Sequence, residues 1–165
     1  MISKFLNKNF YINFSIIISV YFIDRLTKMF VIQLDKNNLG SDIFNSTYLN
    51  IVLIWNKGIA FGLLSFNEDY LYNILSAIIS MIVVVLVIMS IKSQGFKRYS
   101  LLMVIGGALG NLHDRIFFKA VPDFIDFHIG SFHWFIFNVS DIFITFGIIF
   151  LIVLEISSNK EEKYE

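Results

Sequence analysis

The sequence has no cysteine among its 165 residues, only one proline, and few charged side chains. The absence of cysteine excludes disulfide bonds, thiolate metal sites and a cysteine nucleophile. The 13 basic residues balance the 13 acidic ones, so no overall positive field argues for a nucleic-acid partner. The abundant residues are apolar: 56% are hydrophobic, and 19 residues are phenylalanine. This composition indicates helices in lipid rather than a soluble domain.

Four windows are apolar and long enough to cross a bilayer, which takes about 20 residues. They cover residues 10–33, 70–91, 99–118 and 134–156. We therefore expect a membrane α-helical fold with four transmembrane helices in a single domain, residues 1–165. The first window contains Asp24 and Arg25 and is followed by no small-residue cleavage site, so we interpret it as an uncleaved span.

The segment between the first two spans, residues 34–69, is long for a loop and therefore predicts structure of its own. Within it, Thr47 to Trp55 is rich in β-branched and aromatic residues, which is typical of a strand. We expect a small β-rich subdomain here, on the extracytoplasmic side of the membrane. We interpret the segment 119–133 as a second, shorter loop.

The distribution of lysine and arginine predicts the orientation of the spans, because cytoplasmic segments carry an excess of these residues. Three basic residues, Lys36, Lys57 and Lys119, fall on the outer side if the N-terminus lies inside. Seven fall on the inner side: Lys4, Lys8, Lys92, Lys97, Arg98, Lys160 and Lys163. The sequence therefore predicts a multi-pass protein with both termini in the cytoplasm.

Two aspartates stand out in this apolar chain. Asp123 follows the third span, and Asp141 lies inside the fourth. An ionisable group within a span costs a few kcal/mol or more and is a functional hypothesis by default. Two such carboxylates near one membrane face suggest an acid/base pair that shares a proton.

Further polar residues are expected at the same depth, near the outer face. Asp24 and Lys28 are four residues apart, as are Asn111 and Arg115, and each such pair shares one helix face. A helix starting at Trp134 would carry Asn138 and Asp141 roughly 6–11 Å below that residue. Lipid excludes such polar stripes, so we expect them to face one another.

Other interpretations of these residues remain. Asp126 is the main rival of Asp123 for the outer catalytic role. A serine–histidine hydrolase or a metal site is a further interpretation, suggested by His113, His128 and His133. The spacing of these histidines matches no familiar ligand pattern. The polar set also fits a proton-coupled transporter, or a scaffold in which polar residues only fix helix packing.

Five motifs, in order and over nearly the whole chain, make the sequence resemble signal peptidase II, the prolipoprotein signal peptidase of bacteria. They are Asp24-Arg25-Leu26-Thr27-Lys28, Asn56-Lys57-Gly58-Ile59-Ala60-Phe61-Gly62, Gly106 to Arg115, Val121-Pro122-Asp123-Phe124 and Phe137-Asn138-Val139-Ser140-Asp141. Arg25, Pro122 and Ser140 stand where other residues are common in the family.

The resemblance implies an aspartic endopeptidase in the bacterial inner membrane, with its active site near the outer face. It implies that diacylglyceryl-modified prolipoproteins are cut before their lipidated cysteine, with Asp123 and Asp141 as catalytic residues. No cofactor and no metal is required. Membrane lipids are the other expected partners, and we expect a monomer.

The resemblance also implies supporting roles for seven residues. The catalytic pair is oriented, or the substrate backbone held, by Asn111, Arg115 and Asn138. The first helix is braced by Asp24 and Lys28. The outer loop is brought over the substrate by Asn56 and Gly58.

Overall fold

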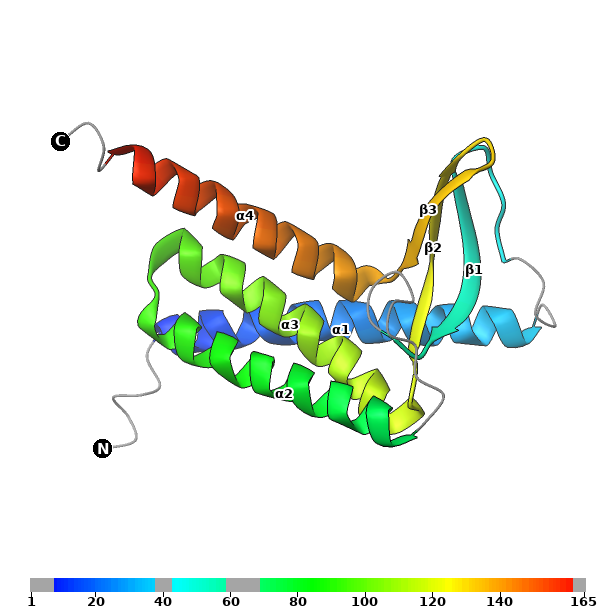
Figure 1. Ribbon diagram of the computed structural model, residues 1–165, viewed down its shortest axis with the longest axis horizontal. Helices are drawn as coiled ribbons and strands as arrows, with labels where there is room; N and C mark the ends of the chain where they lie inside the picture. Colours follow the sequence, from blue (N-terminus) through cyan, green and yellow to red (C-terminus); the bar gives the residue numbers. More distant parts are fainter. Residues whose placement is uncertain (1–7, 38–42, 59–68, 162–165) are drawn as a thin grey trace.

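The computed structural model describes residues 8–37, 43–58 and 69–161, and it is predominantly helical with one small sheet (Figure 1). The helices are α1 (Lys8–Asn37), α2 (Asp69–Lys92), α3 (Gly95–Phe118) and α4 (Val139–Glu161). The strands are β1 (Leu49–Asn56), β2 (Val121–Ile129) and β3 (Phe132–Phe137). The sheet lies at one end of the helices, and the beginning of α1 and the end of α4 lie at the other.

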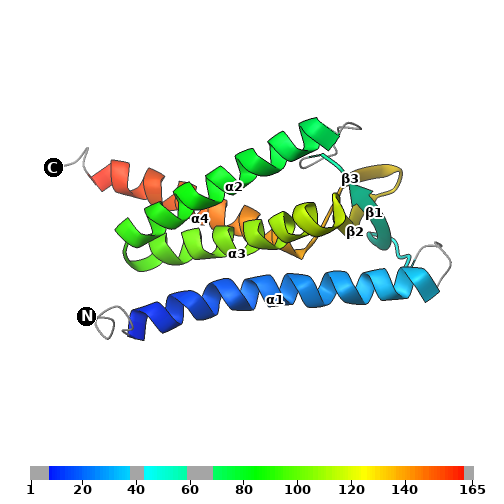
Figure 2. The same ribbon diagram turned by 90° about the horizontal axis from the view of Figure 1, so that it is seen from below.

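Helix α3 is the centre of the helical part. It packs against α1, α2 and α4, and Figure 2 shows α1 running along the opposite side of α3 from α2. Its glycines permit this close packing, because a Cβ atom at Gly107 would lie 2.6 Å from the carbonyl oxygen of Ser140 on α4. A Cβ atom at Gly106 would lie 2.7 Å from the Cβ atom of Val20 on α1. The backbone of α3 therefore packs directly against α1 and α4.

Three helices of the described residues are long and apolar enough to cross a membrane. These segments are Tyr72–Lys92, Gly95–Phe118 and Val139–Ser158. Little of the α2 and α4 segments is buried within the protein, so their exposed apolar side chains need a lipid environment. Helix α1 is also long, at 30 residues, but it carries Asp24, Arg25 and Lys28 in its middle.

The sheet is antiparallel, with the strand order β1-β2-β3. The prediction of a strand within Thr47–Trp55 is confirmed by β1. Residues 121–124 of β2 pair with β1 alone, because β3 joins β2 only from Ile125 onward. Pro122 lies in this part, where its missing N–H interrupts no ladder to a third strand. The pairing of β1 with β2 is irregular between Ile51 and Ile54, next to Asp123.

Two boundaries predicted from the sequence are wrong. The segment 119–133 is not a loop, because it contains β2 and the start of β3, joined by the two-residue turn Gly130-Ser131. The last helix begins at Val139 rather than Trp134, because the aromatic run before it forms β3. The predicted depth of Asp141 below Trp134 assumed a helix between them and does not apply. A purely hydropathic window does not distinguish an apolar strand from an apolar helix.

Candidate active site

Asp141 is fixed by the first turn of α4. Asn138 precedes the helix, and its side-chain oxygen accepts a hydrogen bond from the Asp141 backbone N–H at 3.2 Å. In return, Asp141 Oδ2 accepts the Asn138 backbone N–H at 3.1 Å. This reciprocal pair is a capping box, which satisfies backbone donors that a helix start otherwise leaves unpaired. The carboxylate of Asp141 therefore sits at a helix N-terminus, where the helix dipole favours negative charge.

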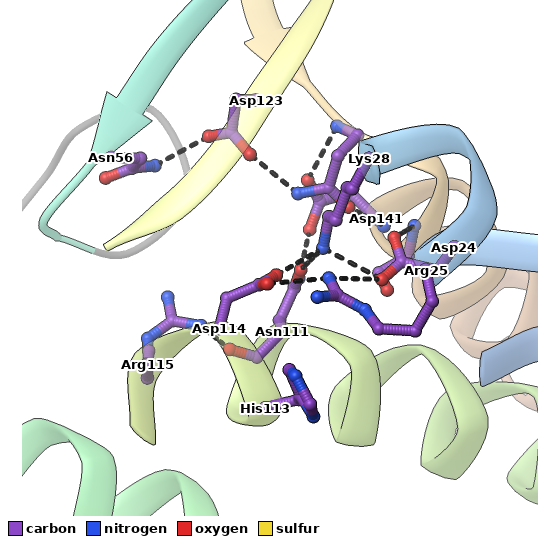
Figure 3. Close-up of polar contacts among 12 residues, drawn as sticks. Asp24, Arg25, Lys28, Asn56, Asn111, His113, Asp114, Arg115, Asp123 and Asp141 are labelled. Carbon is purple, nitrogen blue, oxygen red and sulfur yellow. Dashed lines mark hydrogen bonds and ion pairs between the residues drawn. The ribbon is translucent and has the colours of Figure 1, made fainter. Parts of the chain in front are cut away.

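Asp123 approaches from the sheet, on β2, and is almost completely buried. Its two oxygens accept from two amides: Asn56 Nδ2 donates to Oδ2 at 2.9 Å, and Asn138 Nδ2 donates to Oδ1 at 2.6 Å. Figure 3 shows Asn56 reaching Asp123 from β1. Asn138 therefore contacts both carboxylates, Asp123 through its side chain and Asp141 through its backbone. One residue links the sheet carboxylate to the helix carboxylate.

A second amide connects Asp141 to a buried cation. Asn111 on α3 donates from Nδ2 to Asp141 Oδ1 at 2.8 Å, and its own oxygen accepts from Lys28 Nζ at 2.8 Å. Lys28 is completely buried and also contacts Asp24 at 2.9 Å and Asp114 at 2.7 Å. These contacts join α1 and α3 directly behind the two carboxylates (Figure 3).

One more residue, Arg25, completes the ionic cluster. Arg25 lies 2.6 Å from Asp114 and 3.2 Å from Asp24. The cluster thus contains two cations and two carboxylates, so it is neutral, as a buried site requires. The remaining oxygen of Asp24, Oδ1, accepts the backbone N–H of Ser140 at 3.0 Å, which ties α1 to the start of α4.

Arg115 joins the loop after β1 to α3. Its Nη2 donates to the carbonyl oxygen of Gly58 at 2.9 Å, and its Nη1 donates to the carbonyl oxygen of Asn111 at 3.2 Å. The Gly58 N–H in turn donates to Asn56 Oδ1 at 2.8 Å, which orients the Asn56 amide that reaches Asp123. Residues 59–62 of the same motif lie outside the described residues.

The two carboxylates and their amide neighbours line one cavity of about 170 Å³ between the sheet and the helices. The polar side chains that line it are Asn56, Asn111, Arg115, Asp123, Asn138 and Asp141. Nine residues were predicted as site residues, and seven of them lie in or next to this cavity, whereas Asp24 and Lys28 lie behind it. A cavity with two carboxylates, amide donors and one guanidinium suits acid/base chemistry on a polar bond.

Two other candidate residues from the sequence, Asp126 and His113, lie outside this cavity. Asp126 is three positions after Asp123 on β2, and alternation along a strand puts it on the opposite face. It contacts His133 at 2.9 Å and Asn50 at 3.3 Å, not Asp141. His113 contacts Tyr21 at 2.9 Å, outside the cavity. This geometry does not support Asp126 as the partner of Asp141.

Sequence reasoning missed the part played by Asp114 and Arg25. Although Asp114 adjoins Arg115 in the sequence, it contacts Arg25 and Lys28 of α1. The signal was available in part, because a carboxylate inside an apolar helix needs a cation partner. Helical spacing gives the face on which such a residue lies, but it does not identify the helix opposite.

The burial of Asp123 changes its acidity. Burial, with the nearby negative charge of Asp141, raises the pKa of Asp123 to about 6. The amide donors of Asn56 and Asn138 and the charge of Lys28 act in the opposite direction but do not cancel the rise. Asp123 therefore retains a proton at pH values where an exposed aspartate has lost it.

This pKa predicts a pH-dependent stability. An aspartate in the unfolded chain has a pKa of about 3.9, so between about pH 4 and 6 the folded protein keeps a proton that the unfolded chain has lost. The stabilisation by this group is complete below pH 4 and is lost as the pH rises through 6. We expect Asp123→Asn to remove this loss, which amounts to about 3 kcal/mol.

The measurement is thermal unfolding in detergent from pH 4 to 7. The stability of the wild-type protein should fall more steeply with pH than that of Asp123→Asn. The matched control is Asp35→Asn, on α1 and outside the cavity, whose curve should run parallel to the wild type. Parallel curves for the wild type and Asp123→Asn would contradict the raised pKa.

Comparisons with known proteins agree with the predicted family. The sequence model of the family described as Signal peptidase (SPase) II matches residues 16–157 of this chain. The chain is 45% identical over 158 residues to the lipoprotein signal peptidase of Pelagibacter ubique (strain HTCC1062), covering 96% of this chain and 95% of that protein. It is 39% identical over 142 residues to that of Anaplasma phagocytophilum (strain HZ), covering 84% and 88%.

The fold is also similar to solved structures. One, a bacterial membrane enzyme determined by the in meso method, superposes with a TM-score of 0.71 at 25% identity and covers 93% of this chain and 92% of its own. Another, also described as a bacterial membrane enzyme, has the same TM-score at 31% identity and covers 86% and 90%. The relatives are therefore named as peptidases, not as transporters or scaffolds.

Proposed function

The chain belongs to the signal peptidase II family, the aspartic peptidases that remove signal peptides from prolipoproteins, and from this premise we propose that Asp123 and Asp141 are its catalytic pair. The observation that carries the proposal is the position of Asn138, which donates hydrogen bonds to both carboxylates. The two acids come from different elements and line one cavity. Asp126, on the other face of β2, lacks these contacts.

Charge balance supports a pair that holds one proton. Arg115 lines the same cavity and contributes one positive charge. A singly protonated pair contributes one negative charge, which leaves the cavity neutral, whereas two carboxylates would leave a net negative charge. The helix N-terminus favours the charge on Asp141, so we place the shared proton on Asp123 at the start of the reaction. The pair still titrates as a unit.

The reaction follows from this arrangement. Asp141 accepts a proton from a water molecule, whose oxygen attacks the carbonyl carbon of the scissile peptide bond. Asp123 gives its proton to the carbonyl oxygen, which forms a tetrahedral diol. The proton on Asp141 then passes to the amide nitrogen, the C–N bond breaks, and a diol proton returns to Asp123. The products are a carboxylic acid on the signal peptide and a free amine on the new N-terminus.

The supporting residues act through position. Asn111 and Asn138 hold the carboxylates. Behind them, Lys28 holds α1 against α3, and Asp24 holds α1 against the start of α4. Arg115 fixes the Gly58 carbonyl, so that the chain after β1 stays at the cavity. Asn56 and Gly58 then bring the outer loop towards the substrate.

We further infer that all four helices span the bacterial plasma membrane as a single monomeric domain. The charges in the middle of α1 face α3 and are neutralised there, so α1 is compatible with lipid on its outer side. The beginning of α1 and the end of α4 lie opposite the sheet, and the basic residues favour the cytoplasm for that end. The cavity then lies near the outer face.

An apolar groove supports a lipid-modified substrate. It has a volume of about 320 Å³ and shares Phe135, Asp141 and Thr145 with the polar cavity. The rest of its lining is apolar: Phe127, Trp134, Phe137, Ile142 and Phe146. An acyl chain or the apolar signal segment would bury its surface here while the scissile bond lies at Asp141. Diacylglyceryl-modified prolipoproteins, cut before the lipidated cysteine, fit this geometry.

The experiment is a cleavage assay with purified protein, in which a diacylglyceryl-modified precursor is compared with the unmodified one. We expect cleavage of the modified precursor, with the cut before the lipidated cysteine established by product mass. Thr145→Trp should raise KM about 10-fold or more, because the indole fills the groove, with a smaller effect on kcat.

The matched control is Val153→Trp, an exposed position two turns further along α4, which should leave KM unchanged. Equal cleavage of modified and unmodified precursors would contradict a lipid-binding groove. A change in kcat alone for Thr145→Trp would show that the groove does not bind substrate. Failure of the wild-type protein to cut either precursor would contradict the proposed substrate.

A further inference from the structure

A second polar cluster lies in the sheet, away from the two catalytic candidates. Asp126 and His128 are two residues apart on β2, and His133 is directly opposite His128 on β3. Residues two apart on a strand, and residues paired across strands, point to the same face of a sheet. The three side chains therefore share one face. One potential ligand atom from each lies within 4.8 Å of the others.

The contacts within this cluster leave one nitrogen unused. His133 Nδ1 lies 2.9 Å and 3.0 Å from the two carboxylate oxygens of Asp126, and Asn50 Nδ2 donates to Asp126 Oδ2 at 3.3 Å. The rings of His128 and His133 are stacked, with centroids 4.9 Å apart. His128 Nδ1 is buried and makes no hydrogen bond. A buried polar atom without a partner is rare and calls for an explanation.

We propose that Asp126, His128 and His133 form a binding site for a divalent transition-metal ion of the zinc class. Two imidazoles and one carboxylate are the ligands that Zn²⁺ accepts, with bonds of about 2.0–2.2 Å. The unpartnered nitrogen of His128 supplies a lone pair to the ion. His133 is half exposed, so the ion can enter and a water molecule can complete a fourth position. Nitrogen and oxygen ligands of this kind disfavour Mg²⁺ and Ca²⁺.

Binding requires only a small rearrangement. Ligand atoms around a tetrahedral zinc ion lie about 3.3 Å apart. The contact between His133 and Asp126 is already close to this value. The remaining adjustment falls on the ring of His128, beside a half-exposed histidine with room to turn. The carboxylate is held in place by Asn50.

The ion would stabilise an irregular part of the sheet. Between the pairs Asp126↔Ile136 and His128↔His133, β3 advances three positions while β2 advances two. Such a bulge leaves ladder hydrogen bonds unmade. A metal bound to both strands beside this point would replace the missing pairing and hold the end of the hairpin. This role is independent of the proposed peptidase chemistry, because Asp126 lies on the opposite face of β2 from Asp123.

The test uses the full chain in detergent, without a histidine tag, and ZnCl₂ as the probe. We expect titration calorimetry to give one ion per chain and thermal unfolding to shift to higher temperature with added ZnCl₂. His128→Ala and Asp126→Asn should each lower zinc affinity about 10-fold or more and abolish the shift. MgCl₂ should produce no shift in any of these proteins.

The matched control is His113→Ala, which removes a histidine from α3 and should bind zinc like the wild type. His133→Cys provides a positive variant, because a thiolate is also a zinc ligand and the chain has no other cysteine. Its complex with Co²⁺ should show a thiolate charge-transfer band that the wild-type complex lacks. Absence of zinc binding by the wild-type protein, or equal binding by His128→Ala and His113→Ala, would overturn the proposal.

Discussion

Replacement of either Asp123 or Asp141 by asparagine is expected to lower turnover of a lipid-modified prolipoprotein by about 10²- to 10⁴-fold or more. Each substitution keeps the shape of the side chain but removes the group that accepts or donates the proton, which is worth this factor in general acid/base catalysis. The loss should appear in kcat, because asparagine is nearly the same size as aspartate and leaves the shape of the cavity and the adjoining groove unchanged. The measurement is the rate of product formation by purified protein in detergent.

The two variants should remain folded and bind substrate, since each side chain keeps one oxygen acceptor for its amide neighbours. The control is Asp35→Asn, which should cleave like the wild type. Full cleavage by Asp123→Asn or Asp141→Asn would contradict the pair. Activity retained in Asp123→Asn and lost in Asp126→Asn would transfer the outer role to Asp126.

Replacement of Lys28 by methionine is expected to destabilise the folded protein by about 3–5 kcal/mol, the range for removing one partner from a buried ion pair. Lys28 Nζ has three N–H donors, and it has three acceptors: Asp24 at 2.9 Å, Asp114 at 2.7 Å and Asn111 at 2.8 Å. Without the ammonium, Arg25 is left to balance two buried carboxylates. The measurement is thermal or denaturant unfolding in detergent.

The matched control is an exposed ion pair between another pair of packed helices, α3 and α4. Lys97 on α3 lies 3.9 Å from Glu155 on α4, but both side chains are exposed, so Lys97→Met should change stability by less than about 0.5 kcal/mol. The double variant Lys28→Met/Asp114→Asn restores charge balance and should recover part of the loss. A Lys28→Met protein as stable as the wild type would contradict the role of this cluster.

The helices were largely predictable because hydropathy reports burial in lipid directly. The windows 70–91 and 99–118 correspond closely to α2, which is a continuous apolar run, and to α3, which is apolar apart from a polar segment near its end. The hairpin was not predicted, because its second strand, Phe132–Phe137, is as apolar as the helix that follows. The signal lay in Gly130, whose φ of 60° is typical of the first position of a two-residue hairpin turn.

The site was predictable as a set of residues but not as a set of contacts. Spacing placed Asn138 and Asp141 on one face, but it did not indicate that they form a capping box at the start of α4. Lys28 and Asp114 are 86 positions apart, and only the packing of α1 on α3 brings them to 2.7 Å. Likewise, the spacing of His128 and His133 shows no ligand pattern until the strands pair.

The attachment of the two carboxylates to different elements has a consequence for inhibition. Asp141 moves with α4, whereas Asp123 moves with a sheet that packs against the helices less extensively than α3 packs against α4. A compound wedged in the groove between Phe137 and α4 would contact Asp141 and is expected to separate the two carboxylates by pushing the sheet away from α4. If the groove binds substrate as proposed, substitutions in its lining that exclude such a compound should also raise KM for the substrate.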